Sequence, residues 1–344
     1  MPGIIFARMI GRRLSVEALV EGVLRGDRAV LGRALSLAGS LRPDDQALAG
    51  EALGRLLPYI PTNAVQIGIT GPPGAGKSSL IEALGSRRVE SGQKLAVLAV
   101  DPTSPESGGS ILGDKTRMET LARHPLALVR PAPSGGHLGG ATLSAREDIA
   151  LCQAAGYGTV LLETVGVGQS ETEVADLADL TVLVLPPAGG DDLQGVKRGI
   201  VEIADILLIN KADGDLKRPA EEARRQYSQA LHLFPPREDG WQVPVRTVSA
   251  HSGAGLDEVW LLIDEYLELA RRSGRLEERR RRQRRAWFRQ CLGTAWRQAL
   301  ARTAHAESLT EAEIAASEGR GWPPKLAQAE IEKVLLPAPL NQKL

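Results

Sequence analysis

The stretch VQIGITGPPGAGKS, residues 65–78, decides the fold class of this chain. Residues 65–70 are a short apolar run of the kind that forms a buried strand. Residues 71–78 match G-x-x-x-x-G-K-[ST] between that strand and a helical pattern. In such a loop, backbone N–H groups turn inward around phosphate oxygens, Lys77 reaches the β- and γ-phosphates, and the Ser78 hydroxyl binds Mg²⁺. A plain Gly/Pro turn is the alternative, and the full match in this context favours a phosphate-binding loop.

Short apolar runs alternate with helical stretches after this loop. Runs without polar alternation suit strands that are buried on both faces, and their alternation with helices is typical of a parallel sheet. We therefore expect an α/β fold, a P-loop NTPase with a mostly parallel central sheet flanked by helices, plus helical N- and C-terminal extensions. The further strands are expected at 94–100, 126–130, 158–164, 180–185, 205–210 and 243–249, and the helices at about 77–91, 145–155, 192–203, 217–232 and 255–272.

The two ends of the chain carry helical patterns of their own. Apolar residues recur at helical spacing over residues 14–56, and Gly26 and residues 42–45 interrupt this pattern. Residues 275–302 form one long helical pattern, which one or two further helices follow. The predicted domains are a helical N-terminal extension at 1–60, a nucleotide-binding domain at 61–273 and a C-terminal helical arm at 274–344.

Composition excludes several classes of function. The 344 residues are 43% hydrophobic and 24% charged, as in an ordinary soluble globular protein. Lys+Arg and Asp+Glu are 42 each, so the chain has no net positive charge that would attract nucleic acid. Aromatic residues are only 3%, too few to predict a surface on which bases stack. Cys152 and Cys291 are the only cysteines, which fits a reducing compartment. No apolar run is long enough to span a membrane, and the basic start before Glu17 lacks a secretory core, although a very short transit peptide stays open.

The arginine run Arg279–Arg285 is the strongest local charge in the sequence. Arginines can bind the phosphates of RNA. Such a run more often covers a solvated helix face, and Glu277 and Glu278 offer counter-charges beside it. We expect a solvated face rather than an RNA site.

A guanine-recognition motif follows the strand expected at 205–210. The sequence NKAD begins at Asn210, and the carboxylate of Asp213 can accept from both N1–H and the 2-amino group of guanine. Adenine offers neither donor, and an unsatisfied buried carboxylate costs about 1–3 kcal/mol. Lys211 would stack on the ring. The motif alone is weak because Asn and Asp are common in turns, but the phosphate loop before it and Ser249-Ala250 after it strengthen the prediction.

Three carboxylates are candidates for binding magnesium with Ser78. Asp101 follows one strand, Asp114 lies in a Gly-rich loop, and Glu163 ends another strand before VGVG. An Asp-Pro turn and a helix N-cap are the alternatives for the first two. The sequence leaves open which oxygens bind the metal directly. The metal residues expected are Ser78, Asp101, Asp114 and Glu163.

The nucleotide contacts expected from these motifs form two groups. We expect GTP or GDP to bind to Pro73, Gly74, Ala75, Gly76, Lys77, Ser78 and Ser79 of the phosphate loop, and to Asn210, Lys211, Asp213, Ser249, Ala250 and His251 of the base loops.

Several segments together resemble the MeaB/ArgK group of P-loop GTPases. They are GPPGAGKSSLIEAL, VDP, GGSILGDKTRM, PSGGHLGG, ETVGVGQSE, GDDLQGVKRGIVEIAD and NKAD, and the resemblance runs from about residue 14 to about 330. It implies a GTPase chaperone of an adenosylcobalamin-dependent acyl-CoA mutase, most often methylmalonyl-CoA mutase, that gates cofactor loading and protects the mutase. It also implies a homodimer joined through the arm, an adenosyltransferase as a further partner, no cobalamin held tightly by this chain alone, and a bacterial cytoplasmic or eukaryotic mitochondrial-matrix location.

The resemblance also implies a third switch near residues 188–198. Its matching polar positions are Asp191, Gln194 and Lys197, and Lys197 is expected to reach the γ-phosphate in the activated complex. An N-capped helix with a solvated face is the alternative for this segment. The catalytic residues expected are Lys77, Glu163, Lys197, Gln194 and Asp191.

The sequence also departs from the family pattern. Residues 104–107 lack a basic residue expected in the first switch, and ATLSARED at 141–148 replaces a more basic stretch. Val167 stands where Ras-like GTPases carry the glutamine that positions water, which predicts slow intrinsic hydrolysis.

Two other functions stay open. One is a phosphotransferase linked to amino-acid transport, for which no acceptor site is visible in the sequence. The other is a metal-delivery GTPase, for which the five histidines are too scattered to form a metal site.

Overall fold

The computed structural model describes residues 14–40, 42–100, 118–130, 141–164, 174–187, 198–235, 237, 240–300, 306–320 and 322–335. Its centre is a seven-stranded sheet in the order β3-β2-β4-β1-β5-β6-β7, and every neighbouring pair of strands is parallel. The expected α/β fold with a parallel sheet is therefore confirmed. The strands are β1 Val65–Thr70, β2 Leu95–Val100, β3 Ala127–Arg130, β4 Thr159–Thr164, β5 Leu180–Leu185, β6 Ile206–Ile209 and β7 Val245–Thr247.

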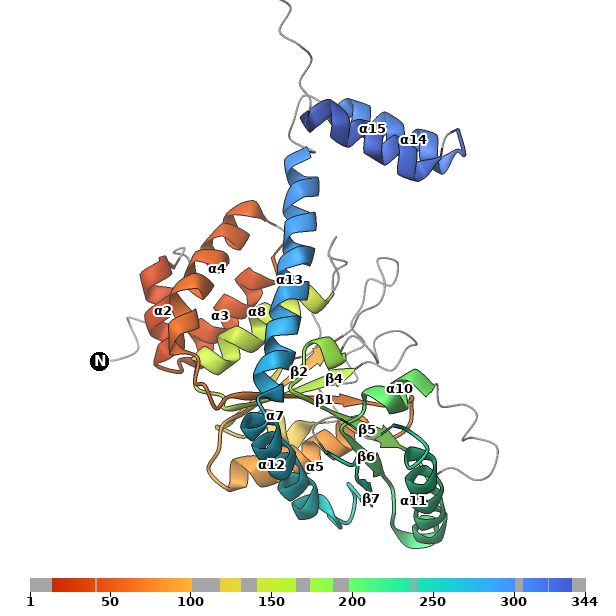
Figure 1. Cartoon of the computed structure of the whole chain (residues 1–344). Helices are drawn as coiled ribbons and strands as arrows, with labels where there is room; N and C mark the ends of the chain where they lie inside the picture. Colours follow the sequence, from red (N-terminus) through yellow and green to blue (C-terminus); the bar gives the residue numbers. More distant parts are fainter. Residues whose placement is uncertain are drawn as a thin grey trace, which may run out of the picture. The chain divides into compact units, whose positions relative to one another are not determined.

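Helices cover both faces of this sheet because alternate residues of a strand point to opposite sides. Val182 and Val184 of β5 lie in one core cluster with α5 and α12, whereas Leu183 and Leu185 lie in another with α10 and α11. Figure 1 shows α5 and α12 below the sheet and α8 above it. The helices of this part are α5 Lys77–Glu90, α7 Glu119–Arg123, α8 Ala141–Ala154, α10 Arg198–Ile203, α11 Lys217–Leu231 and α12 Leu256–Arg272, with the 3₁₀ turns η1 Leu57–Tyr59, η2 Val174–Asp176 and η4 Gly214–Leu216.

The N-terminal helices pack on the same face of the sheet as α8 (Figure 1). They are α2 Val16–Leu24, α3 Arg28–Ala38 and α4 Pro43–Leu56. The interruption expected at Gly26 is confirmed, since Gly26 takes φ +72 after α2. The interruption expected at 42–45 lies earlier, because α3 ends at Ala38 and Pro43 already opens α4. Asp27 caps α3 by accepting from the backbone N–H of Ala29 and Val30 at 2.9 and 3.1 Å. These helices share a core cluster with residues of β2 and β4, so they belong to the same packed body as the sheet.

The strand register brings the expected site to one edge. Glu163 of β4 lies opposite Ile69 of β1 and Ala99 of β2. The phosphate loop follows β1 directly, and Val100 is the last residue of β2. Because all strands are parallel, the loops after β1, β2, β4 and β6 leave from the same carboxyl edge, which is where open α/β sheets bind ligands.

The chain divides into two compact units, Met1–Arg281 and Arg282–Leu344. Helix α13, Arg275–Leu300, begins in the first unit and continues into the second, which also contains α14 Ala306–Ser317 and α15 Pro323–Leu335. The domain limits predicted from the sequence, 1–60, 61–273 and 274–344, stay a prediction. Within the described ranges, no helix has both the length and the apolar character needed to cross a membrane.

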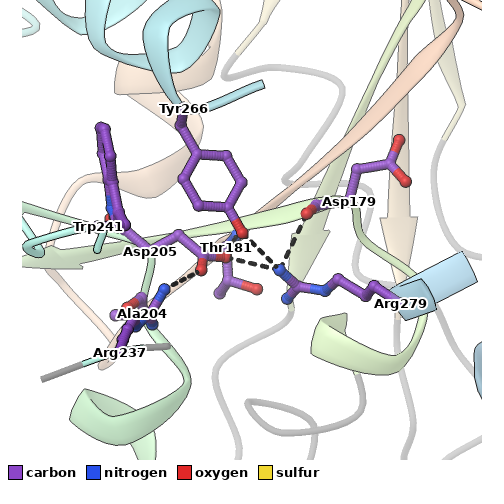
Figure 2. Close-up of polar contacts among 8 residues, drawn as sticks. All are labelled: Asp179, Thr181, Ala204, Asp205, Arg237, Trp241, Tyr266 and Arg279. Carbon is purple, nitrogen blue, oxygen red and sulfur yellow. Dashed lines mark hydrogen bonds and ion pairs between the residues drawn. The ribbon is translucent and has the colours of Figure 1, made fainter. Parts of the chain in front are cut away.

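Two aspartates stand at the opposite, amino edge of the sheet. Asp179 directly precedes β5 and Asp205 directly precedes β6, and their exposed fractions are 0% and 2%. Arg279 of α13 donates to Asp205 Oδ2 and to the Asp179 carbonyl, both at 2.9 Å, and Arg237 pairs with Asp205 Oδ1 at 2.6 Å (Figure 2). Burial alone raises the pKa of Asp205, but the charges of Arg279 and Arg237 outweigh it, so the pKa is lowered.

Arg280 completes this cluster. Its Nε and Nη2 donate to the two carboxylate oxygens of Asp179 at 2.7 and 2.6 Å, and Nη2 also donates to the Ala64 carbonyl at 2.7 Å. We call Asp179, Asp205, Arg237, Arg279 and Arg280 the amino-edge clamp. It holds the first turns of α13 against the sheet.

The solvated helix face expected for the arginine run is wrong for Arg279 and Arg280. Local spacing offered Glu277 and Glu278 as counter-charges, but two buried aspartates far away in sequence bind these arginines instead. Arg281 does behave as expected, since it is exposed and pairs with Glu277 at 3.3 Å.

Candidate nucleotide-binding site

The phosphate loop has the backbone that its glycines were expected to provide. Gly71 takes φ +146, and a Cβ there would lie 2.0 Å from the Val184 carbonyl oxygen. Gly76 takes φ +86, and a Cβ there would lie 2.6 Å from Nδ2 of Asn210. Side chains at these two positions would therefore clash with β5 and with Asn210 of the NKAD loop. The loop runs straight into α5, whose first N–H groups lack helical acceptors and can bind an anion.

Lys77 is held above the loop. Its exposed fraction is 8%, and its Nζ donates to the carbonyls of Gly71 at 2.7 Å and Pro72 at 3.2 Å. The two carbonyls hold the ammonium against the loop that leads into α5. This arrangement fits a lysine that binds phosphate oxygens.

Ser78 and Glu163 meet beside the phosphate loop. The Ser78 hydroxyl donates to Glu163 Oε1 at 2.6 Å, and the two residues are 9% and 5% exposed. A hydroxyl and a carboxylate side by side belong to the oxygen donor set that Mg²⁺ prefers, so these residues fit the expected metal. The other two expected ligands, Asp101 and Asp114, lie outside the described residues. Among the residues that are described, no three His, Cys, Asp or Glu side chains gather as a metal site.

Asn210 connects three loops. It is 1% exposed, and its Nδ2 donates to the carbonyls of Ala75 at 3.0 Å and Gly76 at 3.3 Å. Its Oδ1 accepts from the backbone N–H of Ala250 at 3.2 Å. One amide therefore fixes the phosphate loop, the NKAD loop and the loop after β7 relative to one another.

Asp213 is oriented by Ser249. The fully buried Ser249 hydroxyl donates to Asp213 Oδ1 at 2.6 Å and accepts from the backbone N–H of Ser252 at 3.0 Å. One carboxylate oxygen is thus held by the protein. Lys211 is exposed and takes φ +61, and His251 is exposed on the next loop.

The structure brings together most of the residues expected from the sequence. They lie around the carboxyl edge of β1, β4, β6 and β7: the phosphate-loop residues 73–79, Glu163, and the expected guanine contacts at 210, 211, 213 and 249–251. Asp191, Gln194 and Lys197 of the expected third switch lie outside the described residues, as do residues 104–107 and Val167. The departure at 141–148 falls in the first turns of α8.

Two buried threonines were missed by the sequence reasoning. Thr164 Oγ1 donates to Thr70 Oγ1 at 3.3 Å, and the two residues are 1% and 0% exposed. Thr70 directly precedes the phosphate loop, and Thr164 directly follows Glu163. Both threonines occupy the last positions of neighbouring strands. A polar residue at the end of an apolar run was the signal in the sequence that could have identified them.

Known GTPases have sequences similar to that of this chain. The family model described as "Methylmalonyl Co-A mutase-associated GTPase MeaB" matches residues 31–305. The chain is 48% identical over 279 residues to GTPase ArgK of Escherichia coli (strain K12), which covers 80% of this chain and 84% of that protein. It is 45% identical over 282 residues to the mitochondrial methylmalonic aciduria type A homolog of Mus musculus, covering 79% of this chain and 68% of that protein.

A solved structure agrees with the fold. The crystal structure of a LAO/AO transport system kinase superposes with a TM-score of 0.71 at 35% identity, and the match covers 93% of this chain and 97% of the other. The resemblance found in the sequence is thereby confirmed, and so is the enzyme class. The chain is a GTPase that belongs to the MeaB family, the methylmalonyl-CoA mutase-associated GTPases.

Proposed function

We propose that this chain is a chaperone of an adenosylcobalamin-dependent acyl-CoA mutase, with methylmalonyl-CoA mutase as its client, and that GTP binding and hydrolysis gate cofactor loading and protect or reactivate the mutase. The observation that carries the proposal is the junction at Asn210, where the phosphate loop and both base loops of a MeaB-family chain are bonded together. The junction supports a guanine nucleotide that spans Lys77 at one end and Asp213 at the other.

Magnesium belongs to this proposal. Ser78 and Glu163 would hold the ion, since their oxygens already lie 2.6 Å apart beside the phosphate loop. When bound, Mg²⁺ neutralises charge on the β- and γ-phosphates. Lys77 would contribute a second positive charge from the phosphate loop, and Asp213 would hold the base in place.

Hydrolysis by the chain alone is expected to be slow. Val167 occupies the position where a glutamine orients water in Ras-like enzymes. We infer that the mutase raises the rate by bringing charge near the γ-phosphate, with Lys197, Gln194 and Asp191 of the expected third switch as the groups that act there. Preorganised charge of this kind is the main source of rate enhancement in phosphoryl transfer.

Single-turnover GTP hydrolysis with and without the mutase tests the proposal. The rate is expected to be low for the chain alone and to rise when the mutase is added. Lys77→Ala is expected to abolish both nucleotide binding and the stimulated rate. Ser86→Ala, at a half-buried position later in the same helix, should leave them unchanged. Fast hydrolysis by the chain alone, or no response to any acyl-CoA mutase, would contradict the proposal.

A phosphotransferase is the second candidate, because the solved structure with a TM-score of 0.71 is titled a transport system kinase. A kinase passes the γ-phosphoryl group to an acceptor rather than to water. Incubation with γ-labelled GTP and candidate amino acids or proteins separates the two functions. Label that appears only in inorganic phosphate supports the GTPase chaperone, and label in an acceptor supports the kinase.

The C-terminal arm supports a homodimer. Phe288, Leu292 and Trp296 stand at intervals of four residues on α13 and are 67%, 55% and 39% exposed. Residues spaced by four lie on one face of a helix, so they form an apolar stripe that a second copy of the arm would cover. We infer that the protein acts as a dimer, with the mutase and the adenosyltransferase that loads it as further partners, in the bacterial cytoplasm or the mitochondrial matrix.

A further inference from the structure

The loop between β7 and α12 is closed on itself by hydrogen bonds. The backbone N–H of Gly253 donates to the Ser249 carbonyl at 2.9 Å, and the N–H of Ser249 donates to the Ala254 carbonyl at 3.0 Å. Ser249 also holds Asp213, as described above. We call residues 249–254 the base loop. Any movement of its turn therefore moves the hydroxyl that orients the guanine-binding carboxylate.

Arg87 of α5 binds this loop through a hydrogen bond to its backbone. It stands near the end of α5, and its Nη2 donates to the Gly253 carbonyl at 3.0 Å. Its Nη1 pairs with the carboxylate of Asp257 in the first turn of α12. The planar guanidinium thus joins the base loop and α12 to α5, the helix that begins at the phosphate loop. A lysine cannot reproduce this fork, because its ammonium is a single point of charge.

The contact requires glycine at its centre. Gly253 takes φ +78, and a Cβ there would lie 2.8 Å from Arg87 Nη2. The left-handed backbone turns the Gly253 carbonyl toward α5, and the missing side chain leaves room for the guanidinium. A larger residue at 253 would both strain the turn and displace Arg87.

A continuous set of hydrogen bonds therefore runs from α5 to Asp213. Arg87 holds the Gly253 carbonyl, the Gly253 N–H holds the Ser249 carbonyl, and the Ser249 hydroxyl holds Asp213 Oδ1. A carboxylate that accepts from N1–H and the 2-amino group together must lie in the plane of the base. Loss of orientation weakens such a pair of bonds more than it weakens a single one.

We propose that Arg87 is a positioning residue for guanine specificity, which acts through the base loop on Asp213. The inference rests on the proposed function only in assuming that Asp213 recognises guanine. It predicts that Arg87 sets the preference for GTP over inosine triphosphate, which lacks the 2-amino group and therefore forms one bond fewer to Asp213.

Nucleotide titration of the full chain in three variants tests the proposal. In Arg87→Met, which keeps the apolar stem, the preference for GTP over ITP is expected to fall by about threefold to tenfold, the size of one hydrogen bond. Arg87→Lys is expected to fall between Arg87→Met and the native chain. Asp257→Asn weakens the ion pair of Arg87 but spares its bond to Gly253, so it should keep the native preference. An unchanged ratio in Arg87→Met, or an equal fall in Asp257→Asn, would overturn the proposal.

Asp213→Asn separates this inference from the proposed function. If Asp213→Asn loses the preference for GTP over ITP while Arg87→Met keeps it, only the role of Arg87 fails. If Asp213→Asn keeps the preference, guanine is recognised elsewhere and both statements fail. Thermal unfolding of each variant separates a loss of fold from a loss of specificity, because a merely structural contact lowers the unfolding temperature without changing the GTP to ITP ratio.

Discussion

Glu163 stands where many GTPases have an aspartate, and its longer side chain determines its geometry. The carboxylate reaches from the end of β4 to the Ser78 hydroxyl at 2.6 Å, while the backbone stays in register with β1 and β2. A buried carboxylate costs free energy unless hydrogen bonds or a cation compensate it. The residue therefore fits a site that gains a cation with the nucleotide.

Glu163→Gln is the residue-scale prediction that follows. Glutamine has nearly the same shape and still accepts a hydrogen bond from Ser78, but it carries no charge for Mg²⁺. We expect the Mg²⁺ concentration needed for half-maximal GTP hydrolysis to rise by about 10- to 100-fold, the usual effect of altering a metal-site carboxylate. Magnesium titration of the hydrolysis rate measures it. Glu90→Gln, at the exposed end of α5, is the matched control, and an equal shift in both variants would contradict the prediction.

At the scale of single residues, the sequence predicts those that belong to short motifs and misses those whose partners are distant in the chain. Lys77, Asn210 and Asp213 were found because their chemistry needs a fixed spacing within a few residues. Arg87 was not found, since its acceptor at Gly253 is 166 positions away in the sequence. Nothing local to α5 distinguishes that arginine from Arg88, its neighbour, which lies over the ring of Trp260 instead.

Helix α13 shows the same limit at the scale of an element. Its extent, Arg275–Leu300, agrees with the helix expected at 275–302, because helical spacing is a local property. Its environment was not predictable from that spacing. The aspartates that bind Arg279 and Arg280 lie just before β5 and β6, and only the folded sheet brings them to the start of α13.

Removing Arg280 is expected to destabilise the first unit. Arg280→Ala would leave the fully buried carboxylate of Asp179 without its two charged donors, and breaking such a pair costs about 3 kcal/mol or more. Urea unfolding, followed by tryptophan fluorescence, measures the change. Arg281→Ala is the matched control one residue away: its pair with Glu277 is exposed, so about 0.5 kcal/mol or less is expected. Equal losses in the two variants would contradict the burial argument.

Helix α8 carries two acidic residues with unusual protonation. Burial raises the pKa of Glu147 to about 7, and the neighbouring Asp148 adds to this. Burial also raises the pKa of Asp148 to about 7, although Arg130 pairs with it at 2.9 Å and lowers it in part. Both groups therefore bind protons more tightly in the folded chain than in the unfolded one.

The consequence is a loss of stability as the pH rises. Stability from these two groups is fully present below about pH 4, is lost between pH 4 and 7, and changes little above that, because the folded pKa values exceed the unfolded ones. Asp205 has a lowered pKa, so its contribution is lost only as the pH falls below about 4, outside this window. We expect the two groups together to lower the native unfolding free energy by about 5 kcal/mol between pH 5 and 8, about 2.5 kcal/mol from each. The drop should shrink in Glu147→Gln/Asp148→Asn, and an equal slope in that variant would contradict the assignment.

At the scale of the whole molecule, the first unit uses the two edges of its sheet differently. The carboxyl edge of β1, β4 and β6 carries the nucleotide loops, whereas the amino edge of β1, β5 and β6 carries the amino-edge clamp. The sequence predicted the parallel sheet through its buried runs and the motif at 71–78. It could not predict the strand order, because pairing depends on contacts between residues distant in the chain.

The dimer is the prediction for the whole molecule. Phe288 and Leu292 expose more than half of their surfaces on one face of α13, and a monomer would leave this apolar stripe in water. Phe288→Ser/Leu292→Ser is expected to convert dimers into monomers, which light scattering over a range of concentrations detects. Leu261→Ser is the matched control, since Leu261 is 69% exposed on α12 and lies outside the stripe. A native chain that is monomeric at every concentration, or a dimer that survives both serines, would show that the stripe is not the dimer interface. Because the serines leave Lys77, Asn210 and Asp213 intact, GTP affinity should stay within about twofold of native if the nucleotide site is complete within one chain.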